Sequence, residues 1–161
     1  MIQIADGFSE RLNLSRNERN ILVLAATLHD IGKLGINQQI LSKPSKLTDI
    51  EYEEVKKHST IGYKIAVTSN VPKDAALCIL HHHERYDGTG YPNKLKGKDI
   101  PKLARMLTLI DSYEVMVRGR SYQPASDKAS IIEEIKRCSG TQFDPELAEI
   151  FIDLISQMEN V

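Results

Sequence analysis

Signals that start α-helices recur along this chain, and no strand pattern competes with them. Ser15 with Glu18, and Thr48 with Glu51, have the spacing of a capping box, in which a hydroxyl and a carboxylate satisfy free backbone amides at a helix N-terminus. After the first box, apolar residues recur at helical spacing. We therefore predict an all-α fold, a compact bundle of about seven helices whose ends converge.

The expected helix bounds follow from apolar periodicity and from residues that end helices. The Gly-rich segment 84–99 predicts a long irregular loop, and 36–47 predicts a connecting loop. Asp144 followed by Pro145 is an N-cap followed by a favoured first helical residue. The predicted helices cover about 1–13, 16–30, 48–57, 60–68, 72–83, 101–117, 126–137 and 144–154.

All five histidines fall in three short stretches of the chain. His29 opens His-Asp-Ile-Gly-Lys, His58 stands alone, and the run 81–83 leads into Glu84. Neutral imidazole is the commonest protein ligand for metals, and a neighbouring carboxylate can bridge two cations. This clustering predicts a metal site that handles phosphate.

The His29-Asp30 pair has an ordinary alternative, a histidine favoured by the helix C-terminus beside a surface carboxylate. Lys33 lies one turn beyond Asp30, where an ammonium could meet a phosphate oxygen. Asp111 sits on an apolar stripe, where an isolated charge costs several kcal/mol unless a cation or an arginine pairs with it. Together these residues favour the metal site.

Composition excludes several classes of function. The 161 residues suit one domain, and the formal charge of −1 provides no basic field for a nucleic acid polymer. No apolar run is long enough to span a bilayer, and the N-terminus has no signal-peptide pattern. Cys78 and Cys138 lie in apolar helical patterns and are interpreted as reduced core thiols. We expect a cytoplasmic domain without membrane contact, although a cytoplasmic domain of a membrane receptor would look the same.

The motifs His29-Asp30-Ile31-Gly32-Lys33, His58, His82-His83-Glu84 and Asp111 resemble the HD superfamily of metal phosphohydrolases. The following Asp87-Gly88-Thr89-Gly90-Tyr91-Pro92 resembles the signature of the HD-GYP family, the bacterial phosphodiesterases of cyclic di-GMP. The likeness extends over nearly the whole chain, including Phe143-Asp144-Pro145. The family pair directly precedes glutamate, which makes His81 the spare histidine.

This resemblance implies two divalent metal ions, with iron or manganese as the expected elements and Asp30 as the bridge. Lys33 would contact the scissile phosphate, Arg120 and Tyr122 would bind substrate, and Tyr91 is either a loop anchor or a substrate contact. The implied metal ligands are His29, Asp30, His58, His82, His83 and Asp111.

The implied activity is hydrolysis of cyclic di-GMP by a metal-activated hydroxide to linear pGpG, and further to GMP. Two alternatives remain open: a weak or silent domain that acts as a binding or regulatory module, and a phosphohydrolase of another nucleotide. The resemblance also suggests diguanylate cyclase domains as partners of the Gly-Tyr-Pro loop.

The sequence departs from the family pattern in three places. The family's upstream His or Glu ligand has no counterpart, because the chain starts with a helix that lacks a cap. We therefore expect a single domain over 1–161, cut from a longer multidomain signalling protein with its N-terminal helix truncated, two metals rather than three, and weak activity. The segment 114–117 differs from the family's phrase after Asp111, and Ser121 replaces a proline.

Overall fold

The computed structural model describes residues 1–119 and 125–158, and over these ranges all regular structure is helical. The predicted all-α fold is confirmed. Eight α-helices and two short 3-10 segments occur in the described residues. They are α1 (Ile2–Arg11), α2 (Arg16–Leu28), η1 (Ile31–Gly35), α3 (Gln38–Leu41), α4 (Asp49–Thr68), α5 (Lys73–His81), η2 (Gly97–Asp99), α6 (Lys102–Arg118), α7 (Lys128–Cys138) and α8 (Pro145–Gln157).

The predicted start signals form as expected. Both capping boxes are complete, since the Ser15 and Thr48 side chains accept from the third helical amide while Glu18 and Glu51 reach back. The Asp144 side chain accepts from the first two free amides of α8. The expected loop 84–99 is irregular apart from η2 at its end.

Two predicted boundaries are wrong. The helices expected over 48–57 and 60–68 are one helix, α4, because no glycine or proline interrupts the backbone between them. The segment 36–47 is not entirely loop, because the Asn37 side chain caps the short helix α3 by accepting from the Gln39 amide. Both misreadings concern the same part of the chain.

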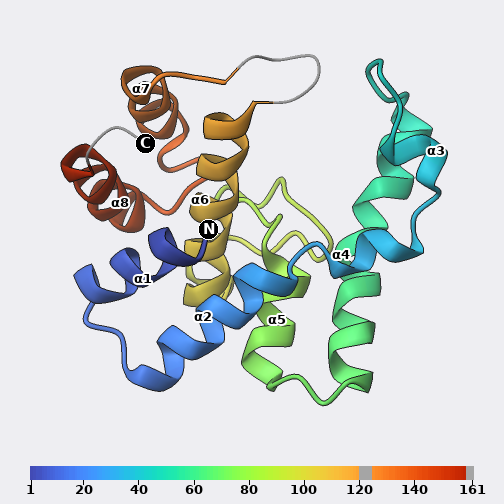
Figure 1. Ribbon diagram of the computed structural model, residues 1–161, viewed down its shortest axis with the longest axis horizontal. Helices are drawn as coiled ribbons and strands as arrows, with labels where there is room; N and C mark the ends of the chain where they lie inside the picture. The colour runs from blue at the N-terminus through green and yellow to red at the C-terminus, as the bar shows by residue number, and fades with distance from the viewer. Residues whose placement is uncertain (120–124, 159–161) are drawn as a thin grey trace.

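Helix α6 lies at the centre of the molecule, with α1, α7 and α8 on one side and α3 and α4 on the other (Figure 1). The main apolar core joins α1, α2, α5, α6, α7 and α8. A much smaller cluster of Ala66, Ala76 and Ile79 joins α4 to α5. No helix in the described residues combines the length and apolar character that crossing a membrane requires.

Candidate metal centre

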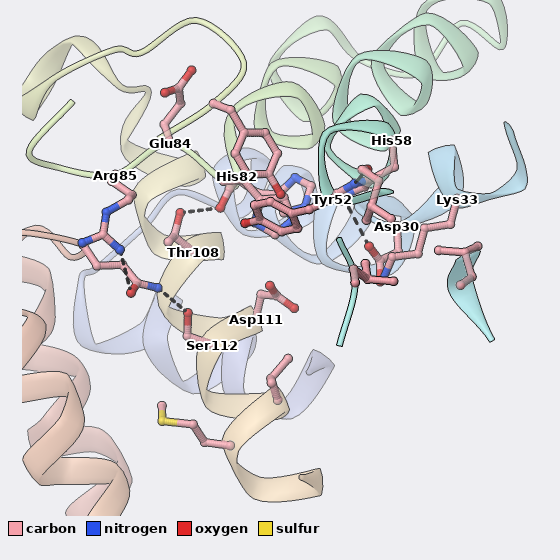
Figure 2. A pocket seen from close by; sticks show the side chains of 18 of the residues that line it. Asp30, Lys33, Tyr52, His58, His82, Glu84, Arg85, Thr108, Asp111 and Ser112 are labelled. Atoms are coloured by element: carbon pink, nitrogen blue, oxygen red, sulfur yellow. Dashed lines mark hydrogen bonds and ion pairs between the residues drawn. The ribbon is translucent and has the colours of Figure 1, made fainter. Parts of the chain in front are cut away.

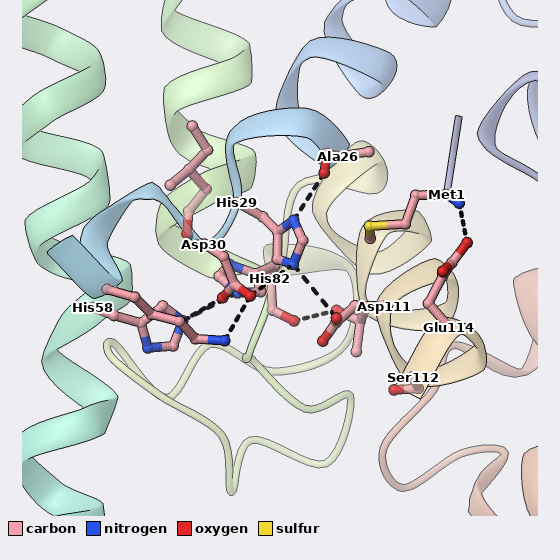
Figure 3. A network of polar contacts seen from close by, with 12 residues as sticks. Met1, Ala26, His29, Asp30, His58, His82, Asp111, Ser112 and Glu114 are labelled. Carbon is pink, nitrogen blue, oxygen red and sulfur yellow. Dashed lines mark hydrogen bonds and ion pairs between the residues drawn. The ribbon is translucent and has the colours of Figure 1, made fainter. Parts of the chain in front are cut away.

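Four helices bring the predicted ligands to one place. His29 caps the C-terminus of α2 and Asp30 directly precedes η1, while His58 lies within α4. His82 caps the C-terminus of α5, and Asp111 projects from the middle of α6 (Figure 3). The ligands lie far apart in sequence and meet because these helices pack against one another.

The same hydrogen bond orients three of the imidazoles. His29 Nδ1 lies 2.8 Å from the Ala26 carbonyl, His58 Nδ1 lies 2.7 Å from that of Val55, and His82 Nδ1 lies 2.7 Å from that of Ile79. In each case the carbonyl belongs to the residue three positions earlier. Because a carbonyl only accepts, Nδ1 carries the proton and Nε2 is left as the donor atom for a cation.

The Nε2 atoms face the two carboxylates. His29 Nε2 lies 3.5 Å from Asp30 Oδ2 and 3.5 Å from Asp111 Oδ1. His58 Nε2 lies 3.7 Å from Asp30 Oδ1 and 3.4 Å from His82 Nε2. The two oxygens of Asp30 thus face different histidines, as the predicted bridge requires.

His83 joins this group from the start of the loop. Ligand atoms of His58, His82 and His83 all lie within 4.8 Å of one another, a spacing that could hold a metal ion. The His82 and His83 rings lie 4.0 Å apart between centroids. Three imidazole nitrogens at this spacing offer a suitable set of ligand atoms for a divalent cation.

Burial and charge set opposite protonation tendencies within the cluster. Burial lowers the pKa of His58, and it lowers the pKa of His82 far below its usual range, so both imidazoles are neutral donors. Burial also opposes charge on His29, but the Asp111 and Asp30 carboxylates outweigh it and raise the pKa of His29. The negative charge that favours a proton there would equally favour a metal ion.

Burial would raise the pKa of Asp111, but the neighbouring His29 outweighs it and lowers the pKa below the ordinary value. This side chain is therefore ionised at neutral pH, and its neighbour in the described structure is His29. Lys33 donates to Asp30 Oδ2 over 2.6 Å, so its ammonium also lies at the site.

A glycine contact sets the spacing between η1 and α4. A side chain at Gly32 would collide with the His58 carbonyl oxygen and would come within 2.5 Å of the Gly62 amide nitrogen. The absence of a Cβ therefore lets Asp30 approach His58. In the sequence, Gly32 stands out only as part of the motif 29–33, and nothing there indicates this close contact.

His81 lies outside the cluster. Its Nδ1 is buried without a hydrogen-bond partner and lies 3.5 Å from Glu84 Oε1. Glu84 is itself buried and accepts from the amides of Asn93 and Leu95, so it holds the Gly-Tyr-Pro loop against the end of α5. In the sequence Glu84 appears only as part of a motif, and this anchoring role emerges from the fold.

A pocket of about 1050 Å³ opens over the cluster. Asp30, Lys33, His58, His82 and Asp111 line one part of it (Figure 2). Tyr91 also lines the pocket and stacks on His83 with 4.9 Å between ring centroids. The predicted substrate residues Arg120 and Tyr122 lie outside the described residues.

The two carboxylates of α1, Asp6 and Glu10, form ion pairs away from the histidine cluster. Asp6 lies 2.8 Å from Arg19 Nε, and Glu10 lies 3.4 Å from Arg19 Nη1. Neither lines the pocket. Glu114, one turn beyond Asp111, pairs with the Met1 amino group.

Comparison with known proteins identifies the family and several relatives. The family model described as "HD domain" matches residues 1–147. A cyclic di-GMP phosphodiesterase of Thermotoga maritima is 39% identical over 155 residues, covering 95% of this chain and 42% of that protein. The 3'3'-cGAMP-specific phosphodiesterase 2 of Vibrio cholerae is 35% identical, covering 91% of this chain and 29% of that protein. The chain thus spans less than half the length of these relatives.

Among solved structures, an HDG"Y"P protein from Bdellovibrio bacteriovorus superposes with a TM-score of 0.76 at 18% identity. The superposition covers 96% of this chain and 50% of that one. At this identity the likeness concerns the fold.

Proposed function

The chain belongs to the HD domain family, in its HD-GYP branch, and on this basis we propose that it is a metal-dependent phosphodiesterase of cyclic di-GMP. One observation supports this most strongly. Histidine and carboxylate donors from four helices converge at one end of a pocket that is roomy enough for a dinucleotide.

The donor set fits two divalent ions. Asp30 would bridge them, with His29 and Asp111 on the side of its Oδ2 and the remaining histidines on the side of its Oδ1. Mixed imidazole and carboxylate ligands suit iron or manganese, which we propose as the ions. When bound, such ions lower the pKa of water and stabilise charge that develops on a phosphoryl group. The histidines of the second side would be His58, His82 and His83.

The chain's own cations would act on the substrate. Lys33 cannot ligate a metal while charged, yet its ammonium lies at Asp30, so we assign it a scissile phosphate oxygen. Arg120 and Tyr122 stay predictions. Hydrolysis of cyclic di-GMP would give linear pGpG, and further hydrolysis would give GMP.

Two alternatives remain open, and one of them has specific support. A relative named for 3'3'-cGAMP makes another cyclic dinucleotide a candidate substrate. A silent binding module, with diguanylate cyclase domains as partners of the Gly-Tyr-Pro loop, remains the other prediction. A cytoplasmic location is likewise a prediction.

The decisive experiment combines metal analysis with turnover. Protein purified without oxygen should contain about two equivalents of iron or manganese and should convert cyclic di-GMP to pGpG, as measured by elemental analysis and chromatography. Turnover of 3'3'-cGAMP alone would identify the other substrate. Bound metal without turnover of either compound would favour the binding module, and absence of metal would refute the proposal.

The same assay tests the individual ligands. Asp30→Ala removes the proposed bridge and should abolish metal binding and turnover together. His81→Ala is the matched control, because this histidine lies next to the ligand pair but outside the cluster. Equal metal content in the two variants would contradict the bridging role.

A further inference from the structure

The pocket has a second end, which the proposed chemistry does not use. Residues 38–57, comprising α3, the following loop and the first half of α4, form what we call the α3–α4 arm, which projects from the bundle (Figure 1). The arm contributes Ile40, Leu41, Leu47 and Val55 to the pocket wall. None of these four residues belongs to either apolar cluster of the described fold. Burial in the core therefore does not explain why they are apolar.

Polar contacts hold the arm in place. Lys43 Nζ donates to both oxygens of Glu51 over 2.7 and 2.9 Å, and Glu51 also closes the capping box of α4. These polar contacts attach the loop to the helix and do not involve the four apolar side chains of the pocket wall. Those side chains remain available to a ligand.

Tyr52 is the aromatic member of this wall. It lines the pocket, and 48% of its surface is exposed although it is a large, mostly apolar residue (Figure 2). Lys56 Nζ lies 4.9 Å from the centre of the Tyr52 ring and is itself held by Glu53 over 2.5 Å. The ammonium thus steadies the ring from one side.

The Lys56 ammonium and the Tyr91 ring connect Tyr52 with the histidine cluster. The same ammonium lies 5.5 Å from the Tyr91 ring centre, and Tyr91 stacks on His83 with an interplanar angle of 31°. Along α4, Tyr52 precedes His58 by about 9 Å of helix axis. A flat group on Tyr52 would therefore lie beside the metal cluster but separate from it.

We propose that Tyr52 is the stacking platform of a base subsite, which receives one purine base of the cyclic dinucleotide while the histidine end receives the phosphate. Every base presents a flat π face, and an aromatic side chain at the edge of an apolar wall binds such a face. Leu47 and Val55 would contact the base beside Tyr52. This inference rests on the proposed function and adds to it the place where the base binds.

Steady-state kinetics on metal-loaded protein test the subsite. Tyr52→Ala should raise KM for cyclic di-GMP roughly tenfold, the scale of one stacked base, with kcat and metal content unchanged. Tyr52→Phe keeps the stacking face and should behave as the unchanged protein. Ile50→Ala is the matched control, because Ile50 lies on the same helix, is 84% exposed and does not line the pocket. Equal KM values for Tyr52→Ala and Ile50→Ala would overturn the proposal.

Equilibrium binding separates failure of this subsite from failure of the proposed function. GMP and ribose 5-phosphate share a sugar phosphate and differ in the base, so calorimetry of both isolates what the base contributes. The unchanged protein should bind GMP more tightly, and Tyr52→Ala should bind the two alike. That result supports the subsite even if no cyclic dinucleotide is hydrolysed. Equal affinity of the unchanged protein for both compounds would refute the subsite whatever the turnover.

Discussion

The two ends of the pocket are built in different ways. At the histidine end, the candidate ligands rest on the main core: Asp111 follows a buried stretch of α6, and the Thr108 hydroxyl of the same helix donates to the His82 carbonyl over 2.8 Å. At the α3–α4 arm, the wall is held by an ion pair and helix caps, and its apolar residues lie outside both clusters.

This difference separates two tasks. Metal ligation and phosphoryl chemistry depend on positions held to a fraction of an ångström, which packed helices provide. Contact with a flat base tolerates small adjustments, which a wall outside the core permits. We therefore expect substitutions at the histidine end to change metal content and turnover, and substitutions on the arm to change substrate affinity.

The largest effect should come from Gly32→Ala, which acts on the junction between the two regions. The added methyl would overlap the His58 carbonyl oxygen and force η1 away from α4. We expect a loss of about 3 kcal/mol or more in unfolding free energy, together with loss of metal.

Thermal denaturation and elemental analysis measure both effects. Gly35→Ala is the control, because its methyl would meet only the Ile61 side chain, at 3.1 Å. If both variants retained metal and stability, the close contact of η1 with α4 would be unimportant.

The second-largest difference between the two regions should be the rate at which cysteines react with a thiol reagent. Burial raises the pKa of Cys78, on α5 beneath the histidines, to about 12, so at pH 8 very little thiolate is present. A thiol introduced by Ile50→Cys on the exposed arm should react with iodoacetamide on the order of 10³ times faster. Mass spectrometry of the native protein measures both rates. Comparable rates would mean that the histidine end opens as readily as the arm.

Lys33→Ala should lower kcat by about 10²–10³ because it removes a charge from the developing phosphoryl transition state. Metal content should stay unchanged, since a charged ammonium is no ligand. The matched variant is Lys57→Ala, whose side chain pairs with Glu54 and does not line the pocket. Parallel loss of metal and turnover would instead make Lys33 structural.

The smallest effect concerns the ion pair that fastens the arm. The Lys43 ammonium and the Thr48 amide lower the pKa of Glu51 from the usual 4.5 to about 2. A depressed carboxyl pKa stabilises the fold above pH 4.5, and this contribution is lost progressively as the pH falls toward 2. In Lys43→Met the Glu51 pKa should rise toward its usual value, as a carbon-detected NMR titration between pH 6 and 4 would show. An unchanged titration would mean that the ion pair does not hold the arm.

Local signals made much of this molecule predictable. Ser15, Thr48 and Asp144 marked helix starts correctly because a cap depends on residues within one turn. The confinement of all five histidines to three short stretches, two of which contain a neighbouring carboxylate, indicated the cluster, because imidazole and carboxylate in such numbers suit few other purposes. Both conclusions rest on short spacings along the chain.

The features that were missed depend on contacts between distant segments. Gly32 packs against Gly62, and Glu84 anchors the loop that follows it, yet neither relation has a pattern in the sequence. For the same reason, nothing in the sequence distinguishes Tyr52 from its neighbours in the predicted helix. Its exposure beside a pocket follows from how α4 leaves the bundle.

The convergence of donors from α2, α4, α5 and α6 has a consequence for the chain as a polymer. Two ions bridged by Asp30, one held by His29 and Asp111 and the other by His58 and His82, would join points that are widely spaced along the backbone. Such a link closes long loops and removes conformational freedom from the unfolded chain, much as a set of crossed disulfides does. Unlike a disulfide, a cross-link made by metal ions would persist in a reducing compartment. Removing the ions with a chelator would then lower the free energy of unfolding as well as abolish catalysis.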